Sequence, residues 1–121
     1  MATPLTRRSS SRVPVQIFVT QRSGDETHRC LSMNLSPDGI YVSRLLQPLR
    51  RTSPQVDLEF CLPGGDEPIR ARGEICFDRF QRHFHGTGIR FTEMAEEDRA
   101  AVTRFVSRLQ AGRARRFTRG T

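Results

Sequence analysis

The sequence has no lysine, little cysteine and no long run of apolar residues. All 20 basic residues are therefore arginine, and against 13 carboxylates they give the 121-residue chain a formal net charge of +7. Exclusive use of arginine is typical of a GC-rich genome, but the positive sign favours anionic partners such as nucleotides, nucleic acid or lipid headgroups. Because no stretch is long enough to cross a bilayer and the N-terminus lacks the apolar segment of a secretion signal, we expect a cytoplasmic protein without membrane insertion.

The scarcity of cysteine argues against a disulfide framework. Cys30, Cys61 and Cys76 are odd in number and have no C-x-x-C spacing, so we interpret them as reduced side chains that pack within strands. Motifs for nucleophilic catalysis are also missing, since there is no G-x-S-x-G sequence and the serines at 9–11 have no histidine near them. We therefore expect no catalytic residue and no enzyme activity.

The three histidines do not form a recognisable metal motif. His83 and His85 share one side of a strand, but His28 would have to converge on them from elsewhere. No cysteine or carboxylate motif supports such a site. We expect no metal site and interpret these histidines as residues of the surface or of a barrel rim.

The pattern of apolar residues indicates one domain of mostly β structure. Alternation with a period of two predicts strands at 13–19, 31–35, 40–42, 56–62, 69–77 and 83–91. Pro63-Gly64-Gly65-Asp66 marks a hairpin turn, and the spacing of Gly86 and Gly88 is typical of a bend or a close backbone approach. These short strands favour a small six-stranded antiparallel β-barrel.

The period changes to that of a helix near the C-terminus. Apolar residues at helical spacing run from Ala101 to Leu109, and acidic residues at 96–98 suit the positive N-terminal end of a helix. We expect this helix to pack against the mouth or flank of the barrel and to end at Gly112. The expected organisation is a flexible arm at 1–12, the barrel and helix at 13–111, and a basic disordered tail at 112–121.

Arginines cluster near the N-terminus in Arg7-Arg8-Ser9-Ser10-Ser11-Arg12. Such a segment is commonly a solvated basic end. An arginine fork, however, matches both a phosphate and the O6/N7 edge of guanine, and it can stack on the base. Arg8 and Arg12 are four residues apart, so both guanidinium groups could face one anion and supply bidentate bonds that lysine could not reproduce.

A polar turn follows at Asn34-Leu35-Ser36-Pro37-Asp38-Gly39. Its proline and glycine positions are typical of a type I turn between two strands. Alternation places Leu35 inward and leaves Asn34 and Ser36 on the solvent side. Asn34 could then donate and accept hydrogen bonds, Ser36 could offer its hydroxyl, and Gly39 would permit an unusual backbone angle or a close ligand approach. We interpret Asp38 as a turn former.

Together the two segments resemble the sequence mark of the bacterial PilZ domain family, RxxxR followed by [D/N]xSxxG. Arg8 to Arg12 and Asn34 to Gly39 match both patterns in full. The resemblance extends through Gly39-Ile40-Tyr41-Val42, the central hairpin, Gly86-Thr87-Gly88-Ile89-Arg90-Phe91 and the final helix, over roughly residues 7–110. It indicates a single-domain member of that family.

The resemblance implies a six-stranded β-barrel that is a non-enzymatic receptor for cyclic di-GMP. Arg8 and Arg12 would clamp guanine and phosphate groups, Asn34 would bond a guanine edge, Ser36 would add a polar contact, and Gly39 would shape the turn. Arg7, which precedes RxxxR, suits a stacked pair of ligands and hence two molecules in one site. The arm at residues 1–12 would become ordered over the ligand and thereby signal to a downstream protein that is not identified.

Two other functions compete with this interpretation. A basic small barrel could bind single-stranded nucleic acid by stacking bases on aromatic residues, and Phe77, Phe80 and Phe84 with Arg79 and Arg82 offer a weak version of that pattern. A degenerate PilZ domain could instead act only as an adaptor between proteins. Because both ligand motifs are intact, we favour cyclic di-GMP over both alternatives, and nucleic acid is not the partner we expect.

Overall fold

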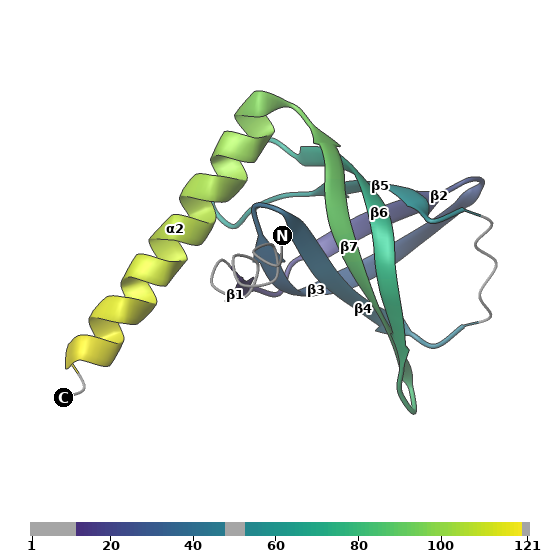
Figure 1. Ribbon diagram of the computed structural model, residues 1–121, viewed down its shortest axis with the longest axis horizontal. Helices are drawn as coiled ribbons and strands as arrows, with labels where there is room; N and C mark the ends of the chain where they lie inside the picture. Colours follow the sequence, from purple (N-terminus) through teal and green to yellow (C-terminus); the bar gives the residue numbers. More distant parts are fainter. Residues whose placement is uncertain (1–11, 48–52, 120–121) are drawn as a thin grey trace, which may run out of the picture.

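The computed structural model describes residues 12–47 and 53–119, with side chains through residue 113 (Figure 1). Two-residue β1 is followed by six longer strands and a helix. Their bounds are β1 Val13–Pro14, β2 Phe18–Ser23, β3 Glu26–Ser36, β4 Gly39–Leu45, β5 Gln55–Phe60, β6 Ile69–Phe80, β7 Phe84–Met94 and α2 Glu96–Arg119.

The strands form one antiparallel sheet that closes on itself. Its order is β1-β3-β2-β5-β6-β7-β4, and an additional pairing of β3 with β4 joins the two ends into a barrel of six strands. Consecutive strands are mostly hairpin neighbours, which suits the short turns in the sequence. The predicted six-stranded antiparallel barrel with a C-terminal helix is therefore confirmed.

The first predicted strand is interrupted. β1 pairs with the end of β3 and β2 pairs with its start, while Val15 to Ile17 lie between them outside regular pairing. The buried hydroxyl of Ser32 occupies the break, where it donates to the carbonyl of Val15 at 2.6 Å and accepts from the backbone N–H of Ile17 at 3.0 Å. A side chain thus replaces the missing ladder bonds, which alternation of apolar residues alone does not reveal.

A register shift in β3 changes which side chains face the core. It lies between Ser32 and Asn34 in the pairing with β4. Cys30 and Ser32 are buried before the shift and Leu35 after it, whereas Met33 is 38% exposed. Leu35 is inward as predicted, but the uninterrupted alternation predicted through Met33 is wrong, because a β-bulge reverses the faces of the residues that follow it.

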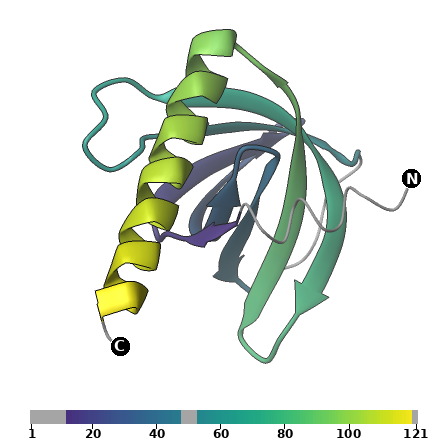
Figure 2. The same cartoon turned by 60° about the vertical axis from the view of Figure 1, so that its left-hand side comes forward.

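The core fills the barrel and continues under α2, which covers one end of it (Figure 2). The helix contributes Val102, Phe105 and Val106 as buried residues, with Ala101 and Leu109 packed beside them. It contacts β1 and β3. The predicted apolar stripe is therefore the face that packs on the barrel.

The helix is longer than its sequence pattern predicts. It continues through Gly112 to Arg119, so a C-cap at Gly112 and a disordered tail over 112–119 are corrected by the structure. Among the described glycines only Gly24 and Gly64 have positive φ, so Gly112 does not take the left-handed conformation that ends helices. Alanine and arginine around it are strong helix formers, and they outweigh the cost of one glycine.

Gly112→Ala is therefore expected to stabilise the protein. A Cβ at this position would meet nothing within 4 Å. Alanine in a helix interior is favoured over glycine by about 0.5–1 kcal/mol. The variant should show more helical circular dichroism and a slightly higher melting temperature. An unchanged helical signal would indicate that residue 112 lies outside a stable helix.

Polar residues are buried in the other end of the barrel. His85 is fully buried on β7, where its Nε2 lies 2.8 Å from Oδ1 of Asp78 and its ring stacks on Phe80 at 4.4 Å between centroids. The interpretation of His85 as a surface or rim residue is thus wrong, because strand alternation carries it to the same side as the core residue Ile89. His83 is exposed and precedes the strand.

The cysteines have unlike environments. Cys30 is buried, its Sγ lies 3.4 Å from Oε1 of Gln21, and burial raises the pKa of its thiol to about 11. Cys61 and Cys76 are exposed, so their predicted role as packing residues is wrong. All three are free thiols.

His28 makes the stability of the fold sensitive to acid. Burial lowers its pKa from the usual 6.5, and so does Arg44, which donates from Nη1 to its Nδ1 at 3.2 Å. His28 therefore takes up a proton more readily in the unfolded chain than in the folded protein. Its contribution to stability is lost as pH falls through the pKa that it has in the unfolded chain. The free energy of unfolding, measured in urea at about pH 7.5 and about pH 5.5, should fall more for the wild type than for His28→Gln. Equal falls would contradict this role.

Candidate functional site

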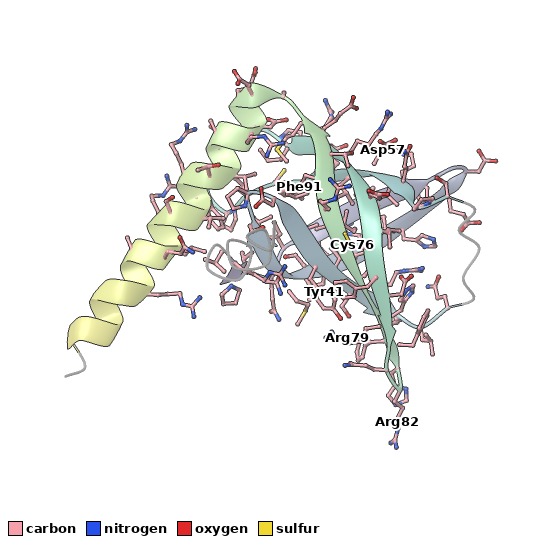
Figure 3. The ribbon with its side chains drawn as sticks, viewed as in Figure 1. Tyr41, Asp57, Cys76, Arg79, Arg82 and Phe91 are labelled. Atoms are coloured by element: carbon pink, nitrogen blue, oxygen red, sulfur yellow. The ribbon has the colours of Figure 1, made fainter. Side chains whose placement is uncertain are left out.

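A cavity of about 180 Å³ lies on the outer face of the barrel, where β4 and β7 meet the β3–β4 turn. It is built from the turn, the outward side chains of three neighbouring strands and the residue before β1. Its lining residues are Arg12, Ser36, Asp38, Gly39, Ile40, Tyr41, Cys76, Phe77, Gly88, Ile89 and Arg90. Figure 3 shows Tyr41 and Cys76 on the strands that form this face.

The turn at the floor of the cavity is held by Ser36. Its Oγ accepts from the backbone N–H groups of Asp38 at 3.2 Å and Gly39 at 3.1 Å. The side chain is only 1% exposed. The prediction that Ser36 faces solvent is therefore wrong, because its hydroxyl closes the turn internally. Its polar contribution to the site is to shape the backbone around the cavity.

Gly39 does not take the unusual backbone angle that the sequence suggested. Its φ is not positive, so the turn needs no left-handed residue there. A Cβ at Gly39 would instead overlap the carbonyl oxygen of Ile89 on the paired strand β7. The absence of a side chain allows β4 to approach β7 at the edge of the cavity.

Neighbouring elements fix the turn from two further sides. Arg99 of α2 donates from Nη1 to the carbonyl of Pro37 at 3.2 Å, and the N–H of Phe91 donates to the carbonyl of Asp38 at 2.8 Å. The loop is thus tied to both the helix and the barrel. Such a site keeps its shape before a ligand arrives.

Aromatic residues that lie outside the RxxxR and [D/N]xSxxG motifs form one wall. The rings of Tyr41 and Phe77 stack at 5.8 Å between centroids, and the guanidinium of Arg79 lies 5.8 Å and 5.6 Å from them. Gly86 and Gly88 lie beneath these rings, since a Cβ on Gly86 would overlap Tyr41 and one on Gly88 would overlap Phe77. The glycine spacing signalled a close approach in the sequence, and the approaching groups are aromatic rings.

Arg90 adds a second cation beside the turn, where it is the register partner of Gly39. It is exposed and forms an ion pair with Glu74 of the neighbouring strand β6. Cys76 lies on the same side with a free thiol. Arginine, aromatic rings and the carboxylate of Asp38 therefore line one small cavity.

The predicted site residues are only partly brought together among the described residues. Arg12, Ser36 and Gly39 line the cavity. Asn34 is half-buried and pairs with Tyr41, so its side chain shares the outer face with that ring next to the cavity. Arg7 and Arg8 lie outside the residues that the structure describes.

A larger hollow of about 570 Å³ lies on the outer face of β2, β5 and β6. Its charged residues neutralise one another, as in the pairs of Arg72 with Asp57 and Glu93 and of Arg70 with Glu59. Within residues 12–47 and 53–119, no group of three or more metal-binding side chains is placed to hold an ion. Over the same residues, α2 lacks the long apolar stretch that a membrane-spanning helix requires.

Known structures share this fold. The Bacillus subtilis inhibitor of motility MotI has a TM-score of 0.74 and 20% identity, and the alignment covers 84% of this chain and 50% of MotI. The PilZ domain of Escherichia coli YcgR with c-di-GMP has a TM-score of 0.66 and 12% identity, covering 88% of this chain and 94% of that domain. This chain therefore spans half of MotI and most of the YcgR domain.

The PlzA protein of Borreliella burgdorferi, in complex with c-di-GMP, has a TM-score of 0.63 and 10% identity, with 90% of this chain and 58% of PlzA covered. No curated protein sequence matches the chain. The sequence model of the PilZ domain matches residues 6–108, which include both the arginine motif and the turn. The chain belongs to the PilZ domain family.

Proposed function

We propose that the protein is a non-enzymatic receptor for cyclic di-GMP. The observation that carries this proposal is the convergence of Arg12, the Ser36–Gly39 turn and the Tyr41–Phe77 ring pair on one cavity. Family membership supports it, as do the related PlzA and YcgR structures that contain this nucleotide.

The chemistry of the cavity suits a guanine base and its phosphate. Tyr41 and Phe77 offer aromatic faces on which a purine can stack, at about 1–3 kcal/mol per base. The guanidinium groups of Arg12 and Arg90 can bond phosphate oxygens or the O6/N7 edge of guanine. Asp38 would repel a phosphate, so we place the N–H donors of the base beside its carboxylate and the phosphates nearer the arginines.

The size of the cavity supports a site that is completed by the arm. Pockets for ligands of drug size measure about 300–1,000 Å³, and this cavity holds about 180 Å³. Cyclic di-GMP has two bases and two phosphates, so the described residues would enclose only part of it. We propose that Arg7 and Arg8 cover the remainder, since the chain reaches the cavity at Arg12 and only three serines separate Arg12 from these residues.

Ordering of the arm would then be the output of the receptor. Residues 1–12 would close over the bound nucleotide and create or hide a surface for a downstream protein. A ligand can drive such a change only as far as it binds the closed form more tightly than the open one. Arg7 and Arg8 would supply that difference, because their contacts with the nucleotide would form only on closure, whereas Arg12 already lines the cavity.

Calorimetric titration tests the receptor function. Wild-type protein should bind cyclic di-GMP at micromolar concentration or below, and cyclic di-AMP should bind much more weakly because adenine lacks the O6 acceptor. Absence of heat with cyclic di-GMP, together with binding of oligothymidylate, would refute the proposal in favour of a nucleic-acid-binding barrel.

The same titration tests the role of Arg7. We expect two molecules of cyclic di-GMP per protein, because a third guanidinium can stack on or bridge an intercalated pair of ligands. Arg7→Leu should reduce the stoichiometry to one and retain binding through Arg8 and Arg12. A wild-type stoichiometry of one would contradict this role of Arg7 without affecting the receptor proposal.

A further inference from the structure

The hairpin between β6 and β7 projects beyond the barrel, at the end opposite α2. Figure 3 shows Arg82 at its far point and Arg79 closer to the barrel. Gln81 and Phe84 close it with a backbone hydrogen bond of 2.8 Å, and the N–H of Leu46 donates to the carbonyl of His83 at 2.9 Å. We use the name hairpin tip for the segment Phe80–Phe84 together with Leu45 and Leu46, which lie beside it.

Large apolar side chains are exposed on both faces of the hairpin tip. Phe84 pairs with Leu45 on the outer face, and they are 47% and 63% exposed. Phe80 points the opposite way, stacked on His85, and is 55% exposed. Isolated exposed apolar residues need no explanation, but a group of them at one projecting point indicates a contact surface.

The charged residues within the hairpin tip and the strand segments that flank it are arginines, and Arg44 connects through His28 to the carboxylate of Glu26. Arg79 and Arg82 are exposed, and residues 79–92 and 39–47 contain no aspartate or glutamate. The nearby carboxylate of Asp78 is directed to His85 and Thr87. The hairpin tip is thus both apolar and cationic, which matches an anionic surface that can also accept apolar groups.

A second basic element projects to the same side of the molecule. In Figures 1 and 2 the C-terminal end of α2 and the hairpin both extend toward the bottom, beyond the rest of the drawn barrel. Arg108 and Arg113 are exposed on that part of the helix. One flat surface could therefore meet both projections.

We propose that this side of the protein docks peripherally on an anionic lipid surface, with Phe84, Leu45 and Phe80 at the headgroup level. A lipid headgroup layer can surround a projecting tip and so cover apolar groups on both of its faces. Arginines near the surface are attracted to anionic lipids. Apolar side chains supply the remaining affinity, as in other proteins that lie on membranes without spanning them. This docking is independent of the proposed nucleotide site.

Vesicle co-sedimentation tests the proposal with the full chain and without nucleotide. Wild-type protein should bind vesicles of phosphatidylcholine mixed with phosphatidylglycerol, and bind pure phosphatidylcholine at least about tenfold more weakly. Phe84→Ser/Arg82→Glu should lose about tenfold or more of the binding to the mixed vesicles. A melting curve confirms that the variant is folded.

Phe18→Ser/Arg29→Glu is the matched control. Phe18 is 62% exposed on β2, outside the hairpin tip, with the guanidinium of Arg29 4.5 Å from its ring centroid, so the charge and apolar area change in the same way. This control should retain vesicle binding. An equal loss in both double variants would attribute binding to net charge alone and overturn the proposal. Failure of the wild type to bind mixed vesicles would also overturn it, whether or not the protein binds an oligonucleotide through Phe84.

Discussion

Arg12→Ala is expected to weaken binding of cyclic di-GMP by about 100-fold. Arg12 is the one arginine of the RxxxR motif whose position is described, and it lines the cavity next to the turn. Loss of a bidentate, charge-assisted contact with guanine or phosphate costs about 3 kcal/mol, which corresponds to about two orders of magnitude in Kd. Calorimetric titration measures this change directly.

Arg22→Ala separates this contact from a general effect of charge. Arg22 is exposed on β2 and lines the other hollow, so its loss lowers the net charge equally. Its Kd should change less than about twofold at physiological ionic strength, because surface charges beyond a Debye length of about 8 Å are largely screened. Equal weakening by both variants would show that Arg12 acts only through net charge.

Gly39→Ala is expected to destabilise the fold by about 3 kcal/mol. The new Cβ would overlap the carbonyl oxygen of Ile89, a backbone atom that cannot rotate away. Overpacking typically costs about 1–3 kcal/mol, and a rigid backbone contact belongs at the upper end of that range. The melting temperature should fall by about 10 °C, and nucleotide binding should weaken because the turn moves.

Gly112→Ala is the control for this substitution, since the same methyl group meets no neighbour there. It should leave nucleotide affinity unchanged. A wild-type melting temperature for Gly39→Ala would show that β4 and β7 can separate at the turn without cost, and the account of the glycine would fail.

Much of the fold could be predicted because its apolar residues follow simple periods. The hairpin of β5 and β6 and the buried stripe of α2 appear directly in the sequence. The break before β2 and the bulge in β3 do not. They depend on a buried hydroxyl, that of Ser32, and on a register shift, both set by contacts between strands that are distant in sequence.

The candidate site, like the fold, could be predicted only in part from the sequence. The turn motif identified Gly39 and Ser36, but their neighbours decide what they do: one allows two strands to approach, and the other closes the turn. The sequence offers Phe77 only within a weak stacking pattern for nucleic acid, and it assigns Tyr41 no role in the site. The two residues meet only because β4 and β6 flank the same strand, β7, and its glycines leave room for their rings. Contacts across a barrel cannot be read from one strand alone.

The most direct measurement of the central claim is a titration of the protein with cyclic di-GMP followed by amide NMR. The account predicts that the largest shifts occur at the turn and the outer face beside it, including the amides of Gly39, Tyr41 and Gly88. Amides around the other hollow, such as those of Asp57 and Glu93, should move little. Shifts centred on that second hollow, or no saturable shifts at all, would contradict the assignment of the nucleotide site.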